Sequence, residues 1–155
     1  MLKPLDVGIL HYTCPPVVGG VERLTAIHAR LLTGHGHRVQ LLAGRGAQLG
    51  GVAATTLLPE LDSKHAAVLS LNATLEGGEV PSAFDAQVCR LEGQLRAALE
   101  GLDVCLVHNA FSLHFNLPLT AALHRLAGTI PTRLVALCHD LSWTNPLYLP
   151  GMRER

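Results

Sequence analysis

The chain has 155 residues, 48% of them hydrophobic and only 15% charged, which is enough apolar material for one compact domain with its own core. The 12 Lys and Arg residues balance the 12 Asp and Glu residues, and this neutrality argues against a nucleic-acid-binding protein. No apolar run reaches the ~18 residues of a membrane span and no signal-peptide-like stretch is present, so we expect a cytoplasmic protein.

Short apolar runs alternate with stretches of helical periodicity along the chain. The apolar runs predict buried strands at residues 6–12, 38–43, 52–58, 104–107 and 134–138. Stretches with one apolar face predict helices at residues 21–33, 84–99 and 117–127. Residues 44–51 contain four glycines and are expected to form a loop, and residues 60–82 leave room for a short helix. This alternation predicts an α/β fold, a Rossmann-like parallel sheet with helices on both faces.

Ligands of such sheets bind beyond the carboxyl ends of the strands. Four loops of this chain occupy that edge in the predicted fold, and they carry most of its unusual polar residues. These loops are residues 12–20, the turn after residue 43, residues 108–114 and residues 139–145. We therefore expect the functional site to be built from them.

The first of these loops ends in Gly19 and Gly20 at the mouth of a predicted helix. Glycine amides approach an anion closely, and a helix N-terminus adds partial positive charge, so this turn is a candidate phosphate site. The alternative is a tight strand-to-helix turn that requires positive φ angles. A G-x-G-x-x-G fingerprint is missing, so NAD is not an expected ligand.

Four cysteines occur, and three of them lie in apolar runs, where cysteine is usually a small buried hydrophobe. Neither they nor the nine histidines have the spacing of a zinc site, so no metal is predicted. The cysteines are Cys14, Cys89, Cys105 and Cys138.

Four landmarks resemble the group 1 (family 4) retaining glycosyltransferases, in the order in which that family has them. They are residues 15–23 (PPVVGGVER), residues 34–39 (GHGHRV), residues 103–109 (DVCLVHN), similar to a D-V-x-x-x-H strand, and residues 134–140 (LVALCHD), similar to a strand that ends in His-Asp. The resemblance runs along nearly the whole chain. It implies a GT-B fold, in which two Rossmann-like domains enclose the active site.

By this resemblance, residues 1–155 are the N-terminal, acceptor-side domain, and the C-terminal donor-binding domain with its E-x7-E motif is absent from this chain. The implied reaction moves a sugar from a nucleotide diphosphate sugar to an acceptor hydroxyl with retention, by front-face attack and with no metal or other cofactor. The isolated domain is expected to be inactive, with the donor bound mainly by the missing domain. Peripheral membrane association of the full-length enzyme stays open.

The resemblance assigns the donor diphosphate to Gly19 and Gly20. It assigns catalysis to His139, which would lie beside the transferred sugar and donate a hydrogen bond, and to Asp140. Asp140 would orient the histidine or bind acceptor hydroxyls, although an aspartate here also caps turns.

Three further residues are candidates for acceptor binding: His108, Asn109 and Trp143. The first two stand at a strand end. The indole would stack on a sugar ring or cover the core. Glu22, in the first turn of the predicted helix, is expected to be structural.

Two other hypotheses stay open: a stand-alone, non-catalytic α/β ligand-binding module, and half of a sugar-nucleotide epimerase. An E-x7-E motif in the coding sequence downstream of Arg155 would distinguish the glycosyltransferase from both.

Overall fold

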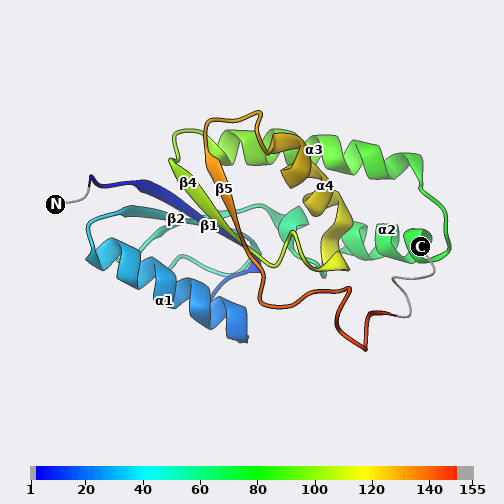
Figure 1. Ribbon diagram of the computed structural model, residues 1–155, viewed down its shortest axis with the longest axis horizontal. Coiled ribbons are helices and arrows are strands. Elements are labelled where there is room, and N and C mark those ends of the chain that lie inside the picture. The colour runs from blue at the N-terminus through cyan, green and yellow to red at the C-terminus, as the bar shows by residue number, and fades with distance from the viewer. Residues whose placement is uncertain (1–2, 150–155) are drawn as a thin grey trace.

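The computed structural model describes residues 3–149, and its centre is a five-stranded parallel sheet in the order β3-β2-β1-β4-β5 (Figure 1). The strands are β1 (Asp6–Thr13), β2 (Arg38–Arg45), β3 (Ala54–Leu57), β4 (Val104–His108) and β5 (Arg133–Leu137). The α-helices are α1 (Gly20–Gly34), α2 (Ala66–Glu76), α3 (Ser82–Leu99) and α4 (Leu117–Leu126). Two short 3₁₀ helices, η1 (Pro59–Leu61) and η2 (His114–Asn116), complete the described chain. The predicted Rossmann-like α/β fold is confirmed.

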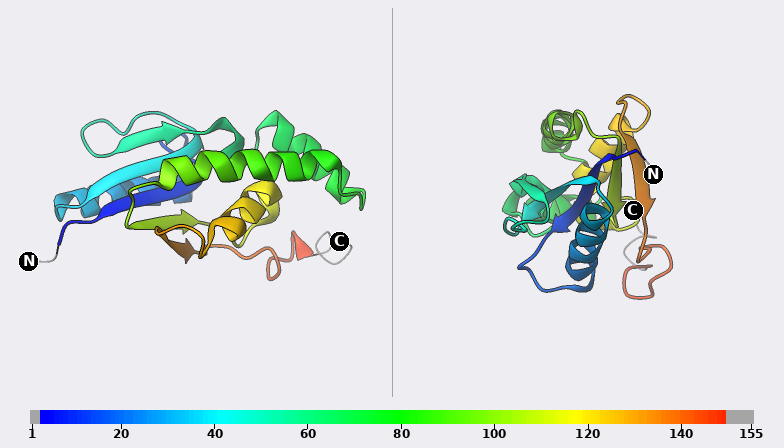
Figure 2. Two further views of the ribbon diagram at one scale, coloured as in Figure 1. Left: turned by 90° about the horizontal axis from the view of Figure 1, so that it is seen from above. Right: turned by 90° about the vertical axis from the view of Figure 1, so that its left-hand side faces the viewer.

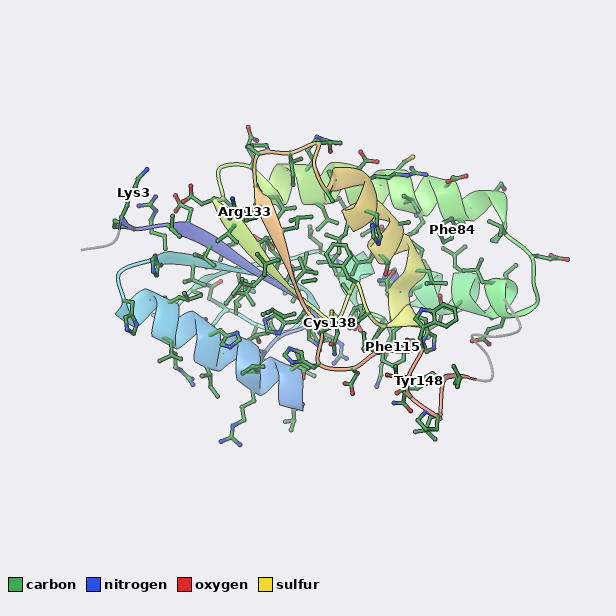
Figure 3. The ribbon with its side chains drawn as sticks, in the orientation of Figure 1. Lys3, Phe84, Phe115, Arg133, Cys138 and Tyr148 are labelled. Carbon is green, nitrogen blue, oxygen red and sulfur yellow. The ribbon has the colours of Figure 1, made fainter. Side chains whose placement is uncertain are left out.

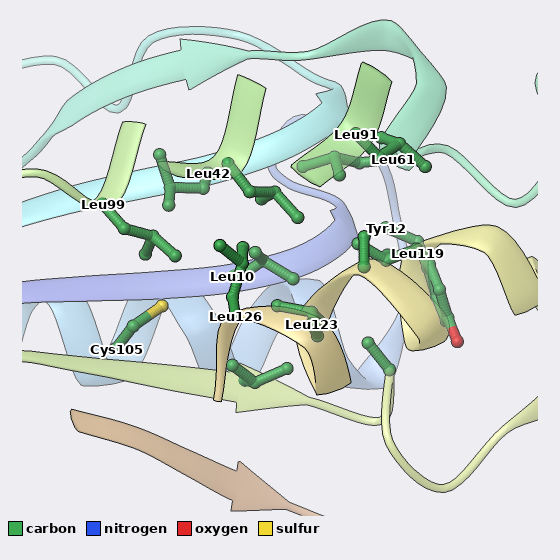
Figure 4. Packing of buried hydrophobic residues seen from close by; sticks show 14 of the residues in the cluster. Leu10, Tyr12, Leu42, Leu61, Leu91, Leu99, Cys105, Leu119, Leu123 and Leu126 are labelled. Atoms are coloured by element: carbon green, nitrogen blue, oxygen red, sulfur yellow. The ribbon is translucent and has the colours of Figure 1, made fainter. Parts of the chain in front are cut away.

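Helices cover the two faces of the sheet through separate apolar clusters. On one face α1 packs through Ala29 onto a cluster that includes Ile9 and Leu41. On the other face α3 and α4 pack on a larger cluster, in which Leu10 and Leu123 are fully buried (Figure 4). Figure 2 shows α1 and α3 on opposite sides of the strands. Burial on both faces explains why the strands read as continuous apolar runs rather than alternating ones.

Strand β2 continues two residues further than its apolar run predicts, because Gly44 belongs to the strand and not to the following loop. A Cβ atom at Gly44 would collide with the backbone of Asp62, directly after η1. The glycine therefore allows η1 to pack against the end of β2. The neighbouring Arg45 donates from Nε to the Asp62 carboxylate at 2.7 Å. This ion pair also holds Asp62 against the end of β2.

The cysteines are less buried than predicted. Cys14 and Cys105 are buried, and burial raises the pKa of the Cys105 thiol to about 12. Cys89 and Cys138 are exposed, so the expected burial of three cysteines is wrong. Cys89 lies on α3, where its sulfur is 3.6 Å from the guanidinium of Arg125 on α4. Cys138 follows the last residue of the edge strand β5 (Figure 3).

The strand order reverses between β1 and β4. From β1 the chain moves outward to β2 and β3, and then returns through α2 and α3 to place β4 on the other side of β1. Loops that leave β1 and β4 thus diverge at the carboxyl edge, which is where ligands of open α/β sheets bind. Within residues 3–149, no helix has both the length and the apolar character needed to cross a bilayer.

The core on the α3 and α4 face predicts a clear stability difference between two leucines. Leu123→Ala, at a site with 0% exposure, should lower the free energy of unfolding by about 2–5 kcal/mol because it leaves a cavity. Leu147→Ala, at a site with 84% exposure, should change it by less than about 0.5 kcal/mol. Urea unfolding of both variants measures the difference, and equal losses would contradict the assigned core.

Candidate functional site

A cavity of about 290 Å³ opens at the carboxyl edge of the sheet, at the reversal of strand order. One wall is the start of α1, and the other is formed by residues that follow β4 and β5. Its lining residues are His11, Tyr12, Thr13, Val17, Val18, Val21, Glu22, Arg45, Asp62, Ser63, Lys64, Asn109, Leu113, Phe115 and Asp140. The mixture of apolar wall and convergent polar groups is typical of a small-molecule site.

The N-terminus of α1 is built differently from the predicted turn. Gly19 is the N-cap residue with an extended backbone, φ −173°, and Gly20 is also absent from the glycines with positive φ. The alternative interpretation, a tight turn that requires positive φ angles, is therefore wrong. A Cβ atom at Gly19 would overlap the carboxylate of Glu22, whereas a Cβ atom at Gly20 would meet nothing within 4 Å. Gly19 thus makes room for a side chain of its own helix, and Gly20 faces open space.

Glu22 folds back over the start of its helix, where a carboxylate is favoured by the helix dipole. It accepts a short hydrogen bond from the hydroxyl of Thr13, the last residue of β1. Its carboxylate also lies 3.9 Å from Nε2 of His11. The side chain therefore ties α1 to β1, and the sequence-based view of Glu22 as structural agrees with these contacts.

Asn109 follows β4 in the left-handed conformation, φ 60°, which asparagine tolerates better than most residues. Its side-chain Oδ1 accepts hydrogen bonds from the amides of His139 at 2.8 Å and Asp140 at 3.3 Å. The backbone N–H of Asn109 donates to the carbonyl of Leu137 at 3.0 Å. Asn109 lines the cavity, but its best-defined contacts hold the chain that leaves β5.

His108 is fully buried, and its Nδ1 lies 2.9 Å from Nε2 of His139 in a hydrogen bond between the two rings. The ring also lies close to two other imidazoles, those of His28 on α1 and His11 on β1. Burial, followed by the nearby imidazoles of His139, His11 and His28, lowers the pKa of His108 from its ordinary value of 6.5 to about 3. His108 is therefore neutral near pH 7.

His11 has a lowered pKa as well, mainly because it is buried. Its Nδ1–H donates to the carbonyl of His108 at 3.1 Å, so the ends of β1 and β4 are joined by a side chain as well as by the sheet. Next to it, the hydroxyl of Tyr12 is buried and has no hydrogen-bond partner among residues 3–149. Tyr12 is a lining residue of the cavity, but its phenol oxygen is buried in the core cluster on the α3 and α4 face.

The structure brings some of the sequence-predicted residues to the cavity and leaves others outside it. Asn109 and Asp140 line it. Gly19 and Gly20 do not, although Val18 and Val21 on either side of them do. His139 is exposed beside the cavity, bonded to the buried His108. Trp143 is 61% exposed and is not a lining residue, so it does not cover the core.

Sequence reasoning placed Tyr12 and Thr13 in a site loop without giving either a role, and it missed His11 as a cavity residue. Their position in the last residues of a buried strand was the available signal. It also missed Lys64 and the ion pair of Arg45 with Asp62. Asp62 and Lys64 lie in residues 60–82, where the sequence has no clear periodicity.

A second cavity, of about 430 Å³, adjoins the first and shares Ser63, Lys64 and Phe115 with it. It lies between α2 and η2, where Phe115 packs edge-on against Tyr148 at 5.4 Å (Figure 3). A third, of about 460 Å³, lies at the opposite, amino edge of the sheet, between the end of α3 and the segment that enters β5. That cavity is remote from the carboxyl ends of the strands. Within residues 3–149, no three His, Cys, Asp or Glu side chains are grouped as a metal site.

No model of a known protein family matches the chain, and no curated protein matches it in a sequence search. The class defined by the fold and the site is thus a Rossmann-like α/β domain with a cavity at its switch point.

The depressed pKa of His108 predicts a loss of stability in mild acid. Because the folded state resists protonation that the unfolded state accepts, this stability is fully present above about pH 6.5 and is lost as the pH falls toward 3. His108 alone should make the protein about 2 kcal/mol less stable near pH 5 than near pH 7.5. His11 acts in the same direction. Urea unfolding at the two pH values measures the effect.

The controls replace one histidine at a time. His108→Gln removes one titrating group and should reduce this pH dependence to the part contributed by His11. His124→Gln, at an exposed site on α4, should leave it unchanged. A wild-type profile that is already flat across this range would contradict the assigned burial.

Substitutions of Asn109 separate its backbone role from its side-chain role. Asn109→Gly keeps the left-handed backbone but loses Oδ1, and should cost about 1 kcal/mol. Asn109→Ala should cost roughly 1 kcal/mol more, because alanine is strained at positive φ. Asn109→Asp keeps the acceptor and should be the mildest change. Amide hydrogen exchange at His139 and Asp140 should accelerate in the Gly and Ala variants only. Unchanged exchange would contradict the hydrogen bonds from these two amides to Oδ1 of Asn109.

Proposed function

We propose that the chain is the N-terminal, acceptor-side domain of a retaining glycosyltransferase. Its substrates are a nucleotide diphosphate sugar and an acceptor with a free hydroxyl. The observation that carries this proposal is the 290 Å³ cavity, which has the start of α1 on one side and Asn109 and Asp140 on the other. A helix N-terminus suits a diphosphate, and a carboxylate suits sugar hydroxyls.

The diphosphate belongs at the Gly20 side of the helix mouth. The carboxylate of Glu22 already covers Gly19, but nothing lies within 4 Å of a Cβ atom placed on Gly20. A phosphate can therefore approach the backbone at Gly20 and at Val21, which lines the cavity. Lys64 and Arg45 add positive charge to the lining of the same cavity, although Arg45 is paired with Asp62.

The acceptor belongs on the side of Tyr12 and Asp140. The carboxylate of Asp140 accepts hydrogen bonds from hydroxyl groups, and the adjoining 430 Å³ cavity gives a larger acceptor room to extend. His139 stands beside this region and would donate a hydrogen bond near the reacting centre.

Front-face transfer with retention needs no protein nucleophile. The departing diphosphate would be stabilised by the N-terminus of α1.

Binding of nucleoside diphosphates tests the proposal directly. In ¹⁵N-labelled wild-type chain, uridine or guanosine diphosphate should shift the amides of Gly20 and Val21 saturably, with affinity in the millimolar range because most donor contacts belong to the other domain. Gly20→Ala should weaken this binding several-fold, since the added methyl occupies the approach to the helix mouth. Stability should be unchanged or slightly higher, because alanine favours helix and the added Cβ has no close neighbour.

The matched control is Gly93→Ala on α3, where an added Cβ also meets nothing within 4 Å but the site is remote from the cavity. It should leave nucleotide binding unchanged. Inorganic phosphate serves as the probe for non-specific anion binding. Nucleotide-induced shifts that avoid the start of α1, or that phosphate reproduces in full, would refute the proposed donor site.

A further inference from the structure

Four imidazoles form a connected group behind the candidate site. His11 lies on β1, His28 on α1, His108 on β4, and His139 follows β5. His108 is at the centre: its ring centroid lies 5.1 Å from that of His139, 5.5 Å from that of His28 and 6.4 Å from that of His11. Only the His139 ring is bonded to it, through Nδ1 of His108 and Nε2 of His139 at 2.9 Å. Of the four residues, His139 is the exposed one.

The proton in this bond has two arrangements. In the first, Nδ1–H of His108 donates to Nε2 of His139. In the second, Nε2–H of His139 donates to Nδ1 of His108, and the only N–H of a neutral His108 then moves to its Nε2. The remaining ring nitrogen, Nε2 of His108, is buried and has no hydrogen-bond partner among residues 3–149.

The buried Nε2 decides between the arrangements. Buried N–H groups without an acceptor are rare in proteins, and unpaired acceptor positions are less so. Among residues 3–149, no acceptor lies in hydrogen-bonding geometry to Nε2 of His108. The rings of His11 and His28 lie beside His108, but neither forms a hydrogen bond with this nitrogen. The first arrangement is therefore favoured.

We propose that His108 is a positioning residue, which fixes His139 in the tautomer with its proton on Nδ1. His139 then presents an N–H donor, and not a lone pair, to whatever binds beside Asp140. Asn109 acts on the same residue from the next position, because its Oδ1 holds the backbone amide of His139 at 2.8 Å. Two consecutive residues, the last of β4 and the one after it, thus set both the place and the tautomer of His139.

This assignment limits what His139 can do. In its neutral form Nε2 accepts from His108 and Nδ1 carries the proton, so neither nitrogen is free to take a proton from an acceptor hydroxyl. His139 serves as a hydrogen-bond donor to a ligand oxygen, either a sugar hydroxyl or an oxygen that gains negative charge. The use toward a sugar rests on the proposed function, whereas the tautomer does not.

The tautomer can be measured without any ligand. In long-range ¹H–¹⁵N spectra of the ¹⁵N-labelled chain near pH 7.5, the protonated and bare ring nitrogens have well-separated shifts. We expect a protonated Nδ1 and a bare Nε2 for His139, and a protonated Nδ1 for His108. A protonated Nε2 on His139 in the wild-type chain would overturn the proposal.

Variants of His108 test cause and effect. His108→Phe removes the donor and should shift the tautomer ratio of His139 roughly tenfold toward Nε2–H, which corresponds to the loss of one hydrogen bond. His108→Gln retains an N–H donor and should hold the wild-type tautomer. His124→Gln, on an exposed face of α4, is the control and should have no effect. A folded His108→Phe variant with an unchanged His139 tautomer would refute the positioning role; if that variant does not fold, the wild-type and His108→Gln spectra decide.

Failure of this proposal and failure of the proposed function give different results. Nucleoside diphosphate binding at Gly20 together with a His139 protonated on Nε2 would refute only the tautomer assignment. The expected tautomer with no nucleotide binding at the start of α1 would refute only the donor site.

Discussion

The parallel pairing of β4 with β1 is the constraint on which the rest of the site depends. It runs from Val7 opposite Val104 to Leu10 opposite Val107. This register brings the next residues of the two strands, His11 and His108, into one layer under α1. If β4 lay beside β3 instead, the loops after β1 and β4 would not diverge, and no cavity would open between them.

Two sets of hydrogen bonds connect this strand pair to the rest of the site. His11 and Thr13 bind to the β4 carbonyl and to Glu22, and so fix the end of β1 against both β4 and α1. His108 and Asn109 then hold the residues that follow β5, one through its ring and one through its side-chain amide. The exposed segment after the edge strand β5 is thereby held by two buried side chains, those of His108 and Asn109. Buried support of this kind keeps the geometry of a solvent-exposed site fixed.

Most of the fold could be predicted from the sequence because buried parallel strands and amphipathic helices leave direct periodic signals. The cavity could be placed because topology fixes the edge at which it lies. The role of Gly44 could not, since its reason is a contact with Asp62, a residue distant in the chain. His108 and Asn109 were expected to contact an acceptor because both are polar and lie at a strand end. Their bonds to His139 depend on the spacing of β4 and β5, which the residue pattern does not reveal.

The carboxylate of Glu22 fills the space that a side chain at position 19 would need. Positions 19 and 22 are therefore sterically coupled, because a side chain at position 19 would displace the Glu22 carboxylate from its place. A sequence that shortened residue 22 could accept a larger residue 19, but it would give up the link from α1 to Thr13. Redesign of this helix mouth has to begin with the pair and not with either residue alone.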